Sequence, residues 1–465
     1  MTQAGTAGIE TGDVMPRSVV TVKNLFGERP YRLSIDGALG DFRPELEFAC
    51  QFLDRCHHLS HQADADLVLH YGGNPPQGAV HVPSVLFPNG VQLKPDGMHP
   101  NFDTLDELAA GSGPGALLPP EDRGDAPPDG VGYDALGLIF LMLSRLEERA
   151  SPATSQDRYG RYPAEASVLS RWSTLATPIA DIAANDIARA LTGESEPRSR
   201  TTYKVWLTHD VDRIRGYFTL RHLFKKAAGD VIFRRDPKSA INSLWRAATS
   251  GEPWRACRYV MDLAESHGHT CHFNFMGPTE NPMDNPYVLR SPGLVRRLAK
   301  EITGRGHIVG FHPGADSRRD VVEWRRQREG LESVIGQQVL EGRHHGLLFD
   351  ADFTWDMWDE EGMEREMSLG YPAPSGFRSG TCRSHPIYSL RHRRPLKLNA
   401  VPTAIMDFGF FGGRYRDVSV DEAISESERI VNVCREHGGD LVVLFHPAEI
   451  RPPRTTFFEK LLEII

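Results

Sequence analysis

The feature that most constrains the fold is an alternation of short apolar runs and helical patterns in the second half of the chain. The apolar runs have the length and composition of buried strands, and the segments between them place apolar residues at helical spacing. The strand-like runs are Thr270 to Met276, Ile308 to Phe311, Ala400 to Met406 and Leu441 to Phe445, and the helical segments are Gly293 to Thr303, Asp320 to Ile335 and Val420 to His437. Strands that alternate with helices build parallel β-α-β units, so the pattern predicts an α/β fold with a barrel-like sheet.

One more apolar run, residues 204–212, reads KVWLTHDVD and ends in two acidic residues, Asp210 and Asp212. Side chains alternate along an extended backbone, so both carboxylates are expected on the same side. Like charges resist sharing a site unless a cation holds them together. The run therefore predicts one edge of a metal site. The alternative is a turn at the end of a strand, in which the carboxylates accept hydrogen bonds from local backbone N–H groups.

A second run ends in a residue type that binds metals. Residues 306–313 read GHIVGFHP, and Pro313 blocks the continuation of a central strand directly after His312. Histidine together with carboxylate suits zinc or another first-row divalent ion better than calcium, which prefers an all-oxygen shell. The two strand ends predict a site for Zn²⁺, with Co²⁺, Ni²⁺ or Mn²⁺ as alternatives. In the competing interpretation, His312 is a buried histidine that is hydrogen-bonded within the core.

Composition excludes several classes of protein. A length of 465 residues fits two to three domains, and 40% hydrophobic with 25% charged residues is typical of a soluble globular protein. The net charge of −9 gives no general attraction to nucleic acid. The six cysteines include no C-x-x-C pair, so reduced thiols are expected. Because the sequence has neither a signal-peptide pattern nor an apolar run of about eighteen residues, it predicts a cytoplasmic protein without a transmembrane segment.

The sequence predicts three parts. Residues 1–20 are polar and small, and a flexible N-terminus is expected there. Residues 21–197 are predicted to form a smaller α/β domain that ends in a helical connector. Residues 197–201 are polar and without periodicity, which is typical of a linker. The larger barrel-like domain is therefore expected at residues 198–465.

The order of the motifs is similar to that of a known family. After the aspartate pair and the strand that ends in His312, residues 376–378 read GFR and residues 444–446 read LFH. Over about residues 203 to 450, the chain resembles the polysaccharide deacetylases of carbohydrate esterase family 4, the NodB-homology fold. The resemblance implies a distorted (β/α) barrel of deacetylase type.

The first half of the chain is also similar to a domain found before a divergent bacterial branch of this family. The matching segments are YDALG at residues 133–137, LSRLEE at residues 143–148 and YGRYPA at residues 159–164. With them the resemblance covers most of the chain. Two roles for this domain stay open: it either covers the site or recruits a partner.

The resemblance implies a role for each candidate residue. Asp210 would be the general base, while Asp212 and His312 would bind the metal. Arg378 would orient the catalytic aspartate. His446 would be the general acid that protonates the leaving amine, which a histidine with a pKa near neutrality can do.

The resemblance does not fix the third metal ligand. The family's H-x-x-x-H motif, which would begin at His312, has its second histidine at position 316, and this chain has Asp316 there. Either that carboxylate replaces the histidine or a ligand comes from elsewhere. Residues 343–345 read RHH and resemble an Arg-Gln-His segment of the divergent branch. We predict His345 as the third ligand, with His344 and Asp316 as alternatives. Asp316 is otherwise expected to be the N-cap of the following helix.

With the predicted metal site, the resemblance implies a metal-dependent hydrolase that removes N-acetyl groups from a sugar or glycan precursor. A metal of this kind polarises the carbonyl and lowers the pKa of water to roughly 7. The substrate would be an N-acetylated sugar, a nucleotide-sugar or a lipid-linked glycan. The alternatives are a catalytically inactive glycan-binding protein on the same scaffold, and an amidase that acts on a non-sugar substrate.

Two further stretches of the sequence each allow two interpretations. The basic residues between Arg213 and Arg246 belong either to a solvated insertion or to a lid that binds the phosphate of a nucleotide-sugar or lipid-linked glycan. Trp355 and Trp358 either stack on a sugar or belong to the core.

Overall fold

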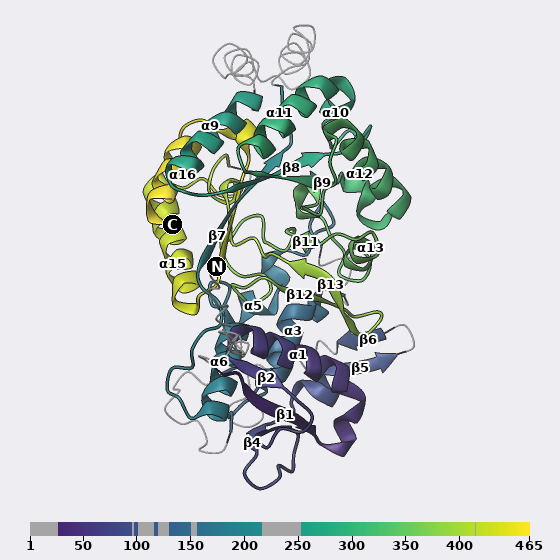
Figure 1. Cartoon of the computed structure of the whole chain (residues 1–465), viewed down its shortest axis with the longest axis vertical. Helices are drawn as coiled ribbons and strands as arrows, with labels where there is room; N and C mark the ends of the chain where they lie inside the picture. Colours follow the sequence, from purple (N-terminus) through teal and green to yellow (C-terminus); the bar gives the residue numbers. More distant parts are fainter. Residues whose placement is uncertain are drawn as a thin grey trace, which may run out of the picture.

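The computed structural model describes residues 27–94, 97–100, 116–119, 130–149, 156–215, 253–413 and 415–465. These residues form a four-stranded sheet, a nine-stranded sheet and a small two-stranded sheet (Figure 1). We call the described residues up to 197 the N-terminal region and those from 198 onward the C-terminal region. The domain boundary itself stays a prediction.

The N-terminal region is built around a parallel sheet with the strand order β2-β1-β3-β4. Helix α3 reads ALGLIFLMLS and is buried at every residue, because an almost wholly apolar helix must lie inside a core. The elements of this region are β1 (Arg29–Ile35), α1 (Arg43–Cys56), β2 (Leu59–His61), β3 (Val68–Tyr71), β4 (Val80–Val82), β5 (Val91–Lys94), β6 (Gly97–Pro100), α3 (Ala135–Ser144), α4 (Leu146–Arg149), α5 (Val168–Arg171) and α6 (Ile179–Thr192). Tyr388 and Leu390 of the C-terminal region complete its buried cluster.

The C-terminal region holds the nine-stranded sheet, in the order β12-β13-β11-β10-β9-β8-β7-β15-β14. All neighbouring pairs in it are parallel except β12 with β13. Its strands are β7 (Lys204–Val211), β8 (Cys271–Met276), β9 (Ile308–His312), β10 (Glu341–Gly342), β11 (Arg365–Glu366), β12 (His385–Ser389), β13 (Arg394–Ala400), β14 (Ile405–Met406) and β15 (Asp440–Phe445). Its helices are α9 (Pro253–Ser266), α10 (Tyr287–Arg290), α11 (Pro292–Gly304), α12 (Val321–Ile335), α13 (Thr354–Glu360), α14 (Asp407–Phe410), α15 (Val420–His437) and α16 (Arg454–Ile464).

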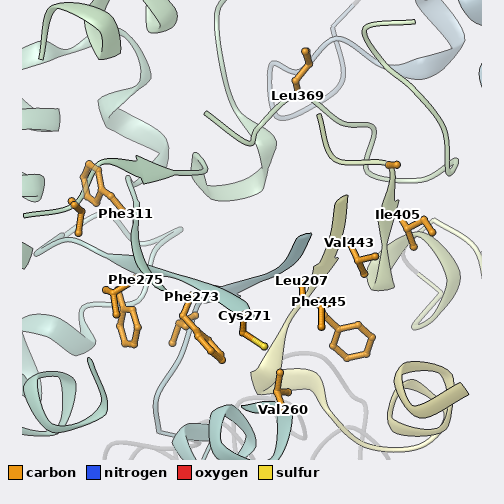
Figure 2. Close-up of a cluster of buried hydrophobic side chains, with 14 of the residues drawn as sticks. Leu207, Val260, Cys271, Phe273, Phe275, Phe311, Leu369, Ile405, Val443 and Phe445 are labelled. Atoms are coloured by element: carbon orange, nitrogen blue, oxygen red, sulfur yellow. The ribbon is translucent and has the colours of Figure 1, made fainter. Parts of the chain in front are cut away.

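Side chains alternate between the two faces along strand β8. Phe273 and Phe275 of β8 point to the side of the helices, where Val260 of α9 faces them (Figure 2). Asn274, between the two phenylalanines, belongs to the opposite face of the sheet. The helices lie outside the arc that the strands describe (Figure 1), and the opposite face carries polar residues such as Asn274 beside small apolar clusters that include Val442 and Leu444.

The expected elements are largely present, whereas the barrel is not confirmed. The helix predicted at Val420 to His437 has these same bounds, because Ser419 and Glu422 form a capping box and Gly438 ends the helix in a left-handed conformation. The stretch predicted as one strand at Ala400 to Met406 is interrupted, with β13 ending at Ala400 and β14 starting at Ile405. Among the described strands, the sheet order has two ends, β12 and β14, so pairing does not close a barrel.

Two further expectations concern the whole chain. All six cysteines are buried and free of disulfides, which confirms the prediction from their spacing. In the described part of the chain, no helix has both the length and the apolar character that crossing a membrane requires.

Candidate metal centre and active site

The candidate site lies at the carboxyl ends of β7, β8 and β9, where the register aligns polar side chains. Asp210 pairs with Asn274, which in turn pairs with Gly310. Asp212 directly follows the last residue of β7, and His312 is the last residue of β9. Because the strands are parallel, their carboxyl ends meet at one edge of the sheet. The two ends predicted from the sequence therefore lie together.

Three side chains at this edge could hold a metal ion. Asp212, His312 and His345 each offer one donor atom, and these atoms lie within 4.8 Å of one another. Asp212 Oδ1 is 3.3 Å from His312 Nε2, and both atoms are buried without a hydrogen-bond partner. Buried polar atoms normally have a partner. Zinc ligands at about 2.0–2.2 Å in a tetrahedral shell lie roughly 3.3–3.6 Å apart, so the donor pair fits a zinc-like ion.

The two histidines are oriented through their other ring nitrogen. His312 Nδ1 lies 2.5 Å from the backbone carbonyl oxygen of Arg343. A carbonyl can only accept, so Nδ1 carries the hydrogen and Nε2 keeps its lone pair. His345 Nδ1 lies 2.5 Å from Asp284 Oδ1, and this carboxylate orients the ring in the same way. Hydrogen bonds of this kind are typical of metal-binding histidines.

Asp212 has the charge that a ligand needs. Burial alone would raise the pKa of its carboxyl group, but the neighbouring His312, His446 and His345 lower it. The net result is a pKa well below the ordinary value for aspartate. Asp212 is therefore ionised at neutral pH.

Asp210 is held by an arginine from another strand. Its Oδ1 accepts hydrogen bonds from Arg343 at 2.8 Å and from Asn274 at 3.0 Å. Arg343 is fully buried and also donates to the hydroxyl groups of Thr208 and Thr403. Burial opposes ionisation of Asp210, but the charge of Arg343 outweighs it and lowers the pKa. Asp210 is thus a buried, oriented carboxylate beside the three-donor cluster.

Arg378, predicted to orient the catalytic aspartate, has a different partner. It pairs with Glu148 of the N-terminal region, at 2.9 Å from Nε and 2.7 Å from Nη2, and donates to the carbonyl oxygen of Gly370. Arg343 makes the contact with Asp210 instead. The prediction was wrong because the motif position gives the residue type, whereas the partner depends on a glutamate about 230 residues earlier in the chain.

His446 follows β15 and forms a pair with Asp407. Its Nδ1 is 2.7 Å from Asp407 Oδ1, and its backbone N–H donates to Asp407 Oδ2 at 3.3 Å. Burial lowers the pKa of His446, but Asp407, together with the charges of Asp212 and Asp210, raises it to about 9. The imidazole is therefore protonated at neutral pH, as a proton donor must be.

The alternatives for the third ligand lie outside the three-donor cluster. His344 is buried, with Nε2 at 3.4 Å from the hydroxyl of Ser317. Asp316 accepts a hydrogen bond from Gln327 at 3.2 Å. It is also not the N-cap of the following helix, because Asp320 caps α12 through the N–H groups of residues 322 and 323.

The structure also bears on the tryptophans Trp355 and Trp358 and on the basic stretch that begins at Arg213. Trp355 and Trp358 are both buried in the core of the C-terminal region, which excludes stacking on a sugar in this conformation. The basic stretch falls outside the described residues except for 213–215. Arg213 pairs there with Glu449.

Four residues of the site were missed by sequence reasoning: Asn274, Asp284, Arg343 and Asp407. Arg343 directly follows β10 and Asp407 directly follows β14, so the same signal that identified Asp212, a polar residue after a strand, was available for both. Asn274 lies inside a strand with apolar neighbours, where an isolated polar residue is a weak signal. Asp284 lies in an irregular segment before α10 and has no local signal.

Comparison with known proteins gives the following matches. Residues 42–196 match a family of unknown function, DUF7033. No curated protein matches the chain. Among solved structures, the chain is similar to a protein described as a polysaccharide deacetylase from Mycobacterium smegmatis, with 18% identity and a TM-score of 0.39 over 57% of this chain and 83% of that one.

Two mutants of a CE4 family pseudoenzyme are also similar to the chain. One, described as having restored enzymatic activity, is 11% identical with a TM-score of 0.29 over 57% of this chain and 61% of its own. The other is 14% identical with a TM-score of 0.28 over 56% of this chain and 62% of its own. With TM-scores this low, the function has to be inferred from the residues of the site.

Proposed function

We propose that this chain is a metal-dependent amide hydrolase of the deacetylase class, which removes N-acetyl groups from a sugar or glycan precursor. The observation that carries the proposal is the three-donor cluster, Asp212 with His312 and His345, in the presence of an ionised Asp210 and a protonated His446. Hydrolysis of an amide requires a base for water and an acid for the amine. The choice of an N-acetyl sugar follows from the motif order, which resembles that of polysaccharide deacetylases.

Each residue of the site has a separate role in the proposed reaction. A divalent ion held by Asp212, His312 and His345 would polarise the acetyl carbonyl and lower the pKa of water. Asp210 accepts the proton that water loses as its oxygen bonds to the carbonyl carbon. His446 gives its Nε2 proton to the amide nitrogen as the C–N bond breaks, since Nδ1 is engaged with Asp407. The products are acetate and an amine. Of the two protons that water brings, one returns to His446 and the other leaves with the amine as an ammonium group, so Asp210 and His446 regain their starting states.

Metal content is the first test. Elemental mass spectrometry is applied to the wild type, Asp212→Ala and His312→Ala after dialysis against trace divalent ions. We expect near-stoichiometric metal in the wild type and loss in both variants. His267→Ala is the matched control, because His267 is exposed at the end of α9 and hydrogen-bonds only within that segment.

Acetate release then tests the reaction itself. The substrates are N-acetylated oligosaccharides and nucleotide-linked N-acetyl sugars, each assayed with and without a chelator. We expect release that stops on chelation and is absent in His312→Ala. Release that survives chelation would contradict the proposal. Absence of metal from all variants, with binding of the oligosaccharide retained, would favour the glycan-binding alternative.

A further inference from the structure

One segment of the N-terminal region reaches the candidate metal centre. Arg161, in the YGRYPA segment, is only 6% exposed. Its Nη1 donates to the carbonyl oxygen of Gly346 at 3.2 Å, and its Nη2 donates to the hydroxyl of Tyr415 at 2.9 Å. Gly346 directly follows His345. The chemistry described above does not use this contact.

Arg161 is fixed on its own side by Asp157. Nε of Arg161 donates to Asp157 Oδ2 at 2.8 Å, and Asp157 Oδ1 accepts from the backbone N–H groups of Tyr159 and Arg161. In the opposite direction, Arg318 of the C-terminal region donates to the carbonyl oxygen of Gly160 at 3.1 Å. Hydrogen bonds on both sides of the loop therefore hold the guanidinium against Gly346 and Tyr415.

The backbone around His345 needs such support. His345 is not on a strand but begins a short turn, in which Gly346 has φ of 70° and Leu347 has φ of 59°. A left-handed conformation is unfavourable for a residue with a side chain, such as Leu347. Tyr415 packs against the small apolar cluster that contains Leu347. Arg161 thus restrains this turn twice, at the carbonyl oxygen of Gly346 and through Tyr415.

We propose that Arg161 is a positioning residue for His345, so that the N-terminal region completes the metal centre of the C-terminal region. The inference rests on the proposed metal site and assigns a role to the N-terminal region in it. Contacts around a ligand typically change metal affinity by about 10–100-fold when they are removed. Because Arg161 acts on the ligand's turn rather than on its ring, we expect the lower end of this range.

The test measures Zn²⁺ affinity of the full chain by competition with a chromophoric chelator. Arg161→Met is expected to bind Zn²⁺ about tenfold more weakly than the wild type. The absorption spectrum of the Co²⁺-loaded variant should also change, since it reports the ligand geometry. Arg43→Met is the control, because Arg43 lies on the exposed side of α1 and pairs with Glu47 on the same helix.

A second variant separates positioning from folding. Arg161→Lys keeps the charge opposite Asp157, but an ammonium group does not reproduce the planar fork that contacts Gly346 and Tyr415 together. We expect weaker Zn²⁺ binding with an unchanged melting temperature of the metal-free protein. If both variants fold and bind Zn²⁺ as the wild type does, the inference is wrong while the metal site stands. The same conclusion follows from Arg161→Lys alone if Arg161→Met does not fold. A wild type that binds no Zn²⁺ would overturn both.

Discussion

At the scale of single residues, the site depends on two ion pairs, one that keeps an acid ionised and one that keeps a base protonated. Arg343 keeps the Asp210 carboxyl ionised, whereas Asp407 keeps His446 protonated. Burial disfavours both charged forms, so each needs its partner. The same partners also orient the side chains, because Arg343 donates to Asp210 and Asp407 contacts Nδ1 of His446.

Replacing Arg343 separates the effect on charge from the effect on stability. In Arg343→Met the Asp210 carboxyl loses its positive partner, so its pKa rises and the acidic limb of the kcat/KM profile moves to higher pH. Removing one partner of a buried pair should also lower the free energy of unfolding by about 3–5 kcal/mol. Urea unfolding and acetate release against pH measure the two effects. Arg378→Met is the control, since Arg378 is equally buried but pairs with Glu148; it should lose stability without moving that limb.

The Asp407→Asn variant tests whether His446 is the general acid. The wild-type pKa of His446 is raised to about 9, mainly by Asp407 acting against burial. Without the negative charge this pKa falls, so His446 loses its proton at a lower pH. The alkaline limb of kcat should therefore move to lower pH, while the acidic limb stays. Asp417→Asn, at an exposed position of the same segment, should leave both limbs in place. An alkaline limb that does not move in Asp407→Asn would exclude His446 as the acid in this protein.

At the scale of elements, strands and helices could be predicted because their signals are local. Apolar runs, capping residues and terminal glycines all lie within the segment that they shape, as at α15. Partners could not be predicted in the same way. Arg343 and Asp210 are 133 residues apart, and Arg378 was given the role of Arg343 because only its motif was visible. His345 was found by family resemblance and lies on a turn, for which sequence periodicity gives no signal.

The close approach of strands at the site predicts the effect of a methyl group. A Cβ at Gly310 on β9 would collide with the Asn274 amide that holds Asp210, and would lie 2.9 Å from the carbonyl oxygen of Glu341. Gly310→Ala should therefore lower the free energy of unfolding by about 1–3 kcal/mol and reduce kcat. Gly293→Ala on α11 is the control, because a Cβ there meets nothing within 4 Å. Equal stability of the two variants in urea would contradict the expected crowding.

At the scale of the whole molecule, the two regions are joined by ion pairs whose carboxylates are buried. Three arginines of the C-terminal region form ion pairs with carboxylates of the N-terminal region: Arg378, Arg383 and Arg393. Their partners are Glu148, Asp181 and Glu45, whose side chains are at most 7% exposed. Separating the regions would leave these carboxylates without the arginines that compensate their burial. We therefore expect the two regions to unfold together in urea, with coincident transitions by fluorescence and circular dichroism.

His385 starts β12 beside this junction and makes the stability of the molecule depend on pH. Its Nδ1 donates to the carbonyl oxygen of Pro386 at 2.8 Å, and burial lowers the pKa of His385 to about 4 from an ordinary value of 6.5. Between these two pH values the unfolded chain binds one more proton than the folded chain, so the contribution of this residue to stability falls as the pH is lowered.

His385→Gln removes this effect. The variant should gain stability relative to the wild type as the pH falls, by about 1.4 kcal/mol for each pH unit and by about 3 kcal/mol near pH 4. Urea unfolding of both proteins between pH 7.5 and about 4 measures the difference, and the comparison cancels the other titrating groups, which are common to both. His267→Gln serves as the exposed substitution of the same type. A constant difference between His385→Gln and the wild type across this range would mean that the folded protein accommodates the charge on His385 at the junction.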